Sequence, residues 1–276
     1  MMPLTEYDTG IGTSYERFSI YALLEKLAGE FNIRSSLEGP IDGITGINGI
    51  NSIALARMGV KATVVLPSVD GIRYAKHFYE VENCQSNVSF ICSKDLALRK
   101  KFDLVWNFNC LPQREDHEAV LEQMAGCSSK FILVFTSNTR NYGFWIHRLH
   151  HRVEKEPWYH GNIEVMNAGK ISASLRKMGF QTIRRLYVDV PWWPDIDSPI
   201  EEVTASFFPF LKRFLKKSRR LEIYKYNRDN FPYFHEERRK ALLRVLSSHP
   251  TFDSSRILPL KLFFAHHRGV LAEKLD

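Results

Sequence analysis

A glycine-rich stretch, residues 37–49, is the part of the sequence best suited to hold a ligand. It reads LEGPIDGITGING and leads from an expected strand that ends at Glu38 into an expected helix that starts near Ile50. Glycines let a backbone approach a bound molecule closely, and the free N–H groups of a helix start attract anionic groups. Ligands of open α/β sheets lie beyond the carboxyl ends of the strands, so this turn is the first candidate binding site. The alternative is an ordinary turn that joins a strand to a helix.

Histidines gather in a second candidate segment, residues 141–160, which reads NYGFWIHRLHHRVEKEPWYH. In a helix, His147, His150 and His151 share one face, because residues three and four apart are neighbours there. The segment lacks an HExxH acid and the spacing fixes no third ligand, so we expect no metal. We expect these side chains to line a substrate pocket or to pack in the interior. In a pocket, His147 or His151 would act as a general base, since imidazole titrates near neutral pH.

A basic amphipathic segment is the third candidate. The net charge is +7, and residues 209–228 hold eight basic side chains against Glu222, so the remainder of the chain is neutral. This distribution argues against a general nucleic-acid binder. In residues 207–220, apolar side chains recur at helical spacing opposite a basic face. We expect a cap helix packed on the rest of the protein; the alternatives are a membrane-surface helix or a grip on an anionic substrate.

The elements that position these candidates alternate between strands and helices. Short apolar runs predict strands and longer amphipathic runs predict helices, which implies a mostly parallel sheet covered on both faces. A final strand is expected from Leu260 to Ala265, continuing towards Leu271, and Ser14 is expected to be the N-cap of an early helix. The expected strands are 35–38, 62–66, 88–92, 104–108, 131–135 and 180–190, and the expected helices are 14–28, 50–58, 71–82, 116–125 and 168–178.

Length and composition predict a folded protein with one main domain and an insertion. The chain has 276 residues, of which 44% are hydrophobic and 25% are charged, and no apolar run approaches a membrane span. Its four cysteines form no CxxC pair, which favours reduced thiols and a cytoplasmic location. We expect residues 1–194 with 256–276 to form the sheet domain, and residues 195–255 to form a helical cap inserted before the last strand.

Several motifs together point to a known family. They are the acidic strand end and glycine turn from Glu38 to Gly46, the phrase KFDLVWN at 101–107, the pair Gly179–Phe180 before a strand, and the ending FFAHHRGVLAEK at 263–274. On these motifs the chain resembles the class I S-adenosylmethionine-dependent methyltransferase family, over roughly residues 15–190 and again in the last strand. The resemblance implies a seven-stranded, mainly parallel Rossmann-like α/β sheet with helices on both faces and an antiparallel last strand.

The resemblance also implies a cofactor, S-adenosylmethionine, and residues that would hold it. Asn107, at the end of the fourth strand, would face the transferred methyl group, so it joins His147 and His151 as a candidate catalytic residue. No [DN]-P-P-[YF] motif follows that strand, which argues against methylation of nucleic-acid bases. The implied cofactor-binding residues are Glu38, Gly39, Asp42, Gly43, Gly46, Ser68, Asp70, Asp95 and Asn107.

One position departs from the family and leaves alternatives open. The family places an acid at the end of the second strand, on the ribose hydroxyls, whereas Leu66 stands here, with Ser68 or Asp70 as substitutes. The first hypothesis is a methyltransferase for a small or medium-sized, possibly anionic molecule. The second is a methyltransferase-like binding or scaffold protein without turnover. The third, a dinucleotide-binding Rossmann protein, is disfavoured because the glycines follow GxxGxxG rather than GxGxxG. The methyl acceptor and the oligomeric state stay open.

Overall fold

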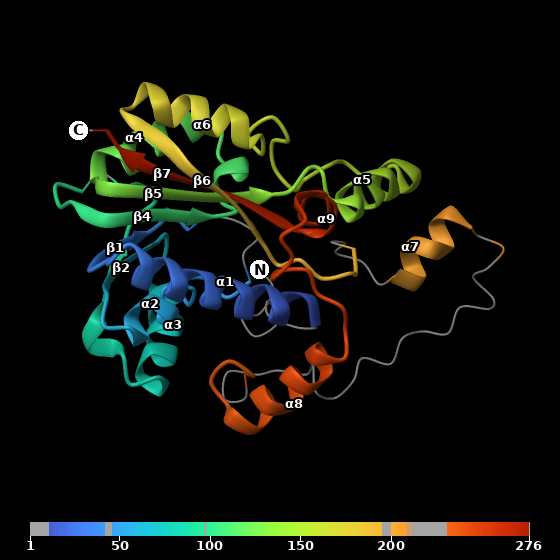
Figure 1. Ribbon diagram of the computed structural model, residues 1–276, viewed down its shortest axis with the longest axis horizontal. Helices are drawn as coiled ribbons and strands as arrows, with labels where there is room; N and C mark the ends of the chain where they lie inside the picture. The colour runs from blue at the N-terminus through green and yellow to red at the C-terminus, as the bar shows by residue number, and fades with distance from the viewer. Residues whose placement is uncertain are drawn as a thin grey trace.

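The structure, a computed structural model, describes residues 11–41, 46–96, 98–194, 200–208, 210 and 231–275. Its centre is a seven-stranded sheet with the order β3-β2-β1-β4-β5-β7-β6 (Figure 1). Strand β7 runs antiparallel to β5 and β6, and the other neighbouring strands pair in parallel. This confirms the expected sheet. The strands are β1 (Ser35–Glu38), β2 (Lys61–Leu66), β3 (Val88–Cys92), β4 (Phe102–Phe108), β5 (Ser128–Ser137), β6 (Phe180–Val188) and β7 (His267–Lys274).

Helices cover both faces of this sheet. Helices α1 (Ile11–Glu30), α2 (Ile53–Arg57) and α3 (Val69–Val81) lie on one face, and α4 (His117–Cys127) and α6 (Ala168–Lys177) lie on the other (Figure 1). Helix α5 (Tyr142–Glu154) follows β5 and extends past its carboxyl end. The remaining helical elements are η2 (Gln85–Asn87), η3 (Leu111–Gln113), α7 (Ile200–Phe207), α8 (Glu236–Ser247) and α9 (Leu258–Phe264). Within the described ranges, no helix combines the length and the apolar character that crossing a membrane requires.

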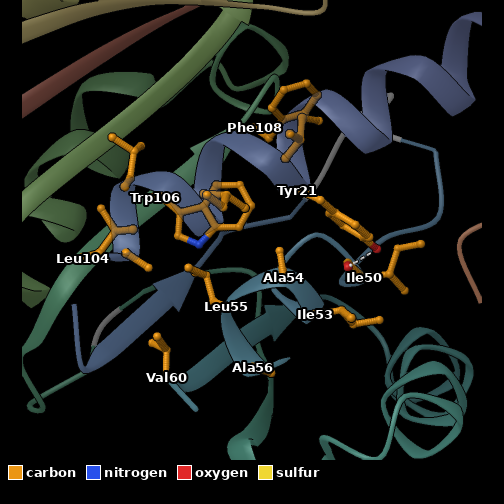
Figure 2. Packing of buried hydrophobic residues seen from close by; sticks show 14 of the residues in the cluster. Tyr21, Ile50, Ile53, Ala54, Leu55, Ala56, Val60, Leu104, Trp106 and Phe108 are labelled. Carbon is orange, nitrogen blue, oxygen red and sulfur yellow. Dashed lines mark hydrogen bonds between the residues drawn. The ribbon is translucent and has the colours of Figure 1, made fainter. Parts of the chain in front are cut away.

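Alternating side chains of the central strands build two cores. Leu104, Trp106 and Phe108 of β4 face the side of α1 and α2, whereas Val105 faces α4 and α6. Trp106 is completely buried among the short α2 helix and the neighbouring strand residues (Figure 2). Removing such a side chain typically costs about 3–5 kcal/mol, so this packing fixes α2 and the glycine turn before it.

The last strand begins later than the sequence suggested. Residues 258–264 form α9, and β7 starts at His267. A short apolar run cannot by itself distinguish a strand from a buried helix. Long-range bonds end this helix, because the side chains of Asn138 and Asn141 donate to the carbonyl of Ala265 at 2.8 and 3.0 Å. Ser14 is also not an N-cap, since it lies inside α1 and is fully buried.

The two ends of the expected insertion meet beside the sheet. Pro191 bridges Thr251, and Phe252 N–H donates to the carbonyl of Val190 at 2.7 Å. Near its end, Phe231 and Tyr233 are each 1% exposed and belong to the same core as Trp106. This part of the insertion therefore packs into the main body. Most of the basic segment 207–220 lies outside the described residues, so its expected helix is not assigned.

Candidate functional site

The carboxyl ends of the parallel strands form one edge of the sheet, where most of the candidate residues lie. β1 ends at Glu38, β4 at Phe108 and β5 at Ser137. Because β7 is antiparallel, its first residue, His267, pairs with Ser137 on one side and Val188 on the other. Groups from both ends of the chain therefore meet at this edge.

Glu38 is held in a buried polar network that fixes the glycine turn. Its carboxylate accepts from the Ser52 N–H at 3.0 Å and the Ser52 hydroxyl at 2.5 Å, at the start of α2. The side chain of Asn51 bonds to Glu38 as well and accepts from the buried Arg17 of α1. Burial raises the pKa of Glu38 to about 7, against the lowering effects of Ser52, Arg17 and Asn51. The network ties α1, β1 and α2 together beneath the turn.

Two glycines of the turn have backbone conformations that favour glycine. Gly39 has a φ of +149°, and a Cβ there would lie 3.0 Å from Cβ of Val65. Gly46 also has a positive φ, at +66°. Gly39 is therefore required by close packing on β2, and both glycines have a backbone conformation that other residues rarely adopt. Asp42 and Gly43, which the sequence analysis placed in the same site, lie outside the described residues.

The position after β2 offers a hydroxyl rather than an acid. Leu66 is buried and ends the strand. Ser68 caps α3, where its Oγ accepts from the Gly71 N–H at 3.1 Å. Asp70 is exposed in the first turn of α3 and pairs with Arg73 at 2.9 Å. Neither candidate substitute therefore sits at the strand end itself.

Asp95 and Asn107 take part in connections between strand ends. Asp95 is exposed after β3 and lies 3.5 Å from Arg114, which follows η3. Asn107 is buried in β4, where its Nδ2 donates to the Pro40 carbonyl at 2.8 Å and its Oδ1 accepts from the Cys110 N–H at 3.2 Å. The Asn107 amide thus holds the loop after β1 against the end of β4, which is a positioning role.

The predicted histidine face exists, and the structure adds a member to it. His147, His150 and His151 are all buried on α5. His160, from the following loop, brings its Nε2 to 3.1 Å from Nε2 of His151, which also lies 3.1 Å from Nε2 of His147. His150 instead contacts the ring of Phe207 on α7. The cluster His147–His151–His160 was missed as a unit because no spacing rule connects His160 to the helix.

A second ionisable cluster, which the sequence analysis missed, occupies the strand-end edge. His267 is 4% exposed, with its Nε2 3.6 Å from Glu16 and its Nδ1 3.8 Å from Asp189. Its ring lies against Phe108, the last residue of β4, at 4.7 Å between centroids. Asp189 directly follows β6 with a left-handed φ of +59°, and such strain is frequent at functional sites. The signal in the sequence was the pair His266–His267 at the start of a reversed strand.

His266 completes this acid–base cluster. Its Nδ1 lies 2.8 Å from Asp189 Oδ2, and its Nε2 lies 3.0 Å from the Trp193 carbonyl. Both partners offer oxygen acceptors, so His266 is held between the Asp189 carboxyl group and the Trp193 backbone. This contact holds Asp189 in place beside His267. The cluster therefore combines two carboxylates and two imidazoles within one small volume.

A cavity of about 770 Å³ runs between α1 and the edge strand β6. It extends to Val188, the ladder partner of His267, and to Tyr15, the neighbour of Glu16 in sequence. Asp253, which also lines it, bonds to the Tyr15 hydroxyl. The cations among its lining residues are Lys26, Arg184, Arg185, Arg256 and Lys261.

The topology defines the class of fold. Dinucleotide-binding Rossmann sheets have the parallel order 3-2-1-4-5-6, whereas here the seventh strand is inserted antiparallel between β5 and β6. The chain has the fold of the class I S-adenosylmethionine-dependent methyltransferases. The glycine turn and the cluster around His267 both lie at the carboxyl edge of this sheet.

Comparison with known proteins agrees with this fold. No protein-family model matches the sequence, and no curated protein matches it. Among solved structures, it is similar to magnesium protoporphyrin IX methyltransferase from Synechocystis PCC 6803 with bound SAH, at 17% identity and a TM-score of 0.53, over 64% of this chain and 79% of that one. It is also similar to the [4+2]-cyclase SpnF, at 14% identity and a TM-score of 0.50, over 92% of this chain and 80% of that one.

Proposed function

We propose that this protein is an S-adenosylmethionine-dependent methyltransferase that acts on a small or medium-sized molecule. The observation that carries the proposal is the meeting of two sites at one sheet edge. The glycine turn after β1 suits a nucleotide-type cofactor, and the cluster around His267 offers acid–base groups beside the end of β4. The acceptor oxygen or nitrogen loses a proton in the course of methylation, and the cluster around His267 would receive it.

The described residues fit the cofactor at the turn. The Gly39 and Gly46 backbone would approach it, and the buried Glu38 network would keep that backbone fixed. Asn107 would hold the neighbouring loop through Pro40. The ribose would find Ser68 instead of an acid, so we expect weaker anchoring there. S-adenosylmethionine supplies, when bound, a methyl group on a cationic sulfonium.

The residues around His267 would receive the acceptor's proton. In the neutral state His267 takes up a proton at Nε2, the nitrogen that faces Glu16 at 3.6 Å. Carboxylates on both sides of the ring stabilise the imidazolium that forms, as Glu16 does at Nε2 and Asp189 at Nδ1. Asp189 also keeps the ring oriented, because its own position is fixed by His266. The surrounding burial keeps bulk water from this site.

The cavity along α1 and β6 supports an anionic substrate. Its cations outnumber its single acid, Asp253. One of the cations, Arg184, is paired with Glu30 outside the lining. The remaining excess of positive charge attracts anions over a long range and raises the local concentration of an anionic ligand. The cavity reaches Val188, so a molecule bound in it would extend towards His267. The methyl acceptor would then be a hydroxyl or amine on a molecule with an acidic group.

The insertion would act as a cap over this site. Tyr233 packs on Phe18 and Tyr21 of α1, and its ring lies 6.0 Å from the guanidinium of Arg17. Arg17 in turn contacts Asn51, next to the start of α2. The insertion therefore reaches the glycine turn through a continuous chain of contacts. Residues 195–255 as a substrate cap, with 1–194 and 256–276 as the cofactor-binding part, remain our proposed division.

A second candidate function is a methyltransferase-like protein that binds ligands without methyl transfer. The absence of an acid after β2 favours it, because Leu66 cannot bond to ribose hydroxyls. The likeness to a [4+2]-cyclase also means that this fold alone does not imply methyl transfer. The two candidates differ in turnover but not in the location of the ligand.

Turnover separates these candidates. We would incubate the protein with S-adenosylmethionine and a panel of hydroxylated or aminated small acids, and measure formation of S-adenosylhomocysteine. His267→Ala should lower kcat by about 10²–10⁴-fold, the usual contribution of a general base, with unchanged affinity for S-adenosylhomocysteine. His117→Ala, on the opposite face in α4, is the matched control. Full turnover in His267→Ala would exclude its role as base, and ligand binding without any turnover would favour the second candidate.

A further inference from the structure

The histidine cluster on α5 has a geometry that hydrogen bonding does not explain. Nε2 of His151 lies 3.1 Å from Nε2 of both His147 and His160, and the three nitrogens all lie within 4.8 Å of one another. One imidazole nitrogen carries either a single N–H or a single lone pair. It therefore makes one good hydrogen bond, not two. Three ring nitrogens that point to one place suit a shared cation instead.

We propose that His147, His151 and His160 bind one divalent transition-metal ion, with Zn²⁺ as the expected occupant. Metal–nitrogen bonds of about 2.0–2.1 Å at tetrahedral angles place two ligand nitrogens about 3.3–3.4 Å apart. The two separations that involve Nε2 of His151, at 3.1 Å, are within a few tenths of an ångström of that value, and the third pair lies within 4.8 Å. An all-imidazole set suits zinc and its neighbours and is unsuited to Mg²⁺ or Ca²⁺, which prefer oxygen.

The surroundings fix the three rings before any ion arrives. His147 and His151 are one helical turn apart on α5 and are 8% and 3% exposed. Trp158 packs against all three imidazoles, with ring centroids 4.8–5.5 Å away, and its Nε1 donates to the Gly161 carbonyl at 3.0 Å. This bond closes the turn that presents His160. The site is therefore built from two elements with fixed positions.

The loop that carries His160 is itself anchored. Asn162 N–H donates to the Pro112 carbonyl at 2.7 Å, and Gly161 lies so close to Pro112 that a Cβ would approach the same carbonyl oxygen to 2.8 Å. Pro112 belongs to η3, which follows β4. The anchor keeps His160 next to α5.

A carboxylate lies where a metal-bound histidine needs one. Within the described part of the chain, Nδ1 of His151 is buried and has no hydrogen-bond partner. Glu156 Oε2 lies 3.9 Å from it, at the end of α5. A metal on Nε2 leaves an N–H at Nδ1, and a carboxylate that accepts a hydrogen bond from this N–H strengthens the ligand. His160 is only half-buried, so the fourth coordination position would take water or a ligand oxygen from that side.

Metal titration of the full chain tests this proposal. The protein is prepared without a histidine tag, stripped with a chelator and titrated with Zn²⁺ against a chromogenic competitor. We expect one Zn²⁺ per chain, and a visible spectrum typical of four-coordinate Co²⁺ when cobalt replaces it. His160→Ala and His151→Ala should lower the affinity by more than the roughly 10–100-fold that loss of an outer partner costs.

The matched control is His150→Ala, because His150 is buried on the same helix but contacts Phe207 instead of the cluster. This variant should keep one Zn²⁺ with unchanged affinity. If His151→Ala does not fold, His160→Gln in the loop provides the same test. Substoichiometric Zn²⁺ in the unmodified protein, or equal affinity in the His160 variants, would overturn the proposal. The result does not depend on methyl transfer, because the readout is metal bound per chain.

Discussion

Replacing Glu38 by glutamine should change how the stability of this protein depends on pH. Burial raises the Glu38 pKa from 4.5 to about 7. Between these values the folded state binds more protons than the unfolded state, so the free energy of unfolding falls as pH rises. The Glu38 contribution is complete below about pH 4.5 and is lost as pH rises through about 7. A shift of this size corresponds to about 3 kcal/mol in total.

The difference between variant and wild type isolates this contribution. Glutamine keeps an acceptor for Ser52 but carries no charge, so Glu38→Gln lacks the pH-dependent cost. Its free energy of unfolding, minus that of the wild type, should rise by about 2–3 kcal/mol between about pH 5 and about pH 8. Any hydrogen bond that the variant loses shifts the whole difference equally and leaves its slope unchanged.

Urea unfolding followed by tryptophan fluorescence at several pH values measures this difference. Glu164→Gln is the control, because Glu164 is exposed and the bond from Lys170 lowers its pKa. That contribution is present above about pH 4.5 and is lost only at lower pH, so the control difference should be flat across the window. A flat or falling difference for Glu38→Gln would refute the claim that Glu38 is charged at a cost in the folded protein.

Two further predictions concern packing and the cavity. Gly269→Ala should lower the free energy of unfolding by about 1–3 kcal/mol in urea titrations. The reason is that the Cβ of the new alanine would lie 2.5 Å from the Phe135 ring. The control is Gly29→Ala, which lies in open space on α1 and should not lower the free energy of unfolding. The double change Lys26→Glu with Arg256→Glu should weaken binding of the anionic dye anilinonaphthalene sulfonate and flatten its salt dependence. Equal binding in this variant would contradict the basic cavity. Its control reverses two exposed lysines outside the cavity, Lys76 and Lys177.

Local patterns in the sequence were sufficient for most of the fold. The apolar runs of β2, β4 and β5 alternate with amphipathic helices, and this alternation predicts a covered parallel sheet. Local patterns do not determine what long-range contacts decide. The run that forms α9 is apolar enough for a strand, and the side chains of Asn138 and Asn141, more than 120 residues away, bond at its end.

The candidate site was predictable only where its residues are close in sequence. The turn after Glu38 and the face of His147 and His151 follow from spacing within one element. The cluster of Glu16, Asp189 and His267 spans nearly the whole chain, and only the sheet order brings its members together. His160 is nearer in sequence, but its position depends on a turn anchored at Pro112. These residues could not be found without the fold.

Calorimetric titration with S-adenosylhomocysteine, beside NAD under the same conditions, tests the central claim most directly. The proposed cofactor site predicts one S-adenosylhomocysteine bound per chain and no heat from NAD. At 100 times its dissociation constant, the ligand should also add about 2.7 kcal/mol to the free energy of unfolding. No S-adenosylhomocysteine bound at millimolar concentration, or preferential binding of NAD, would contradict the assignment of the glycine turn to S-adenosylmethionine.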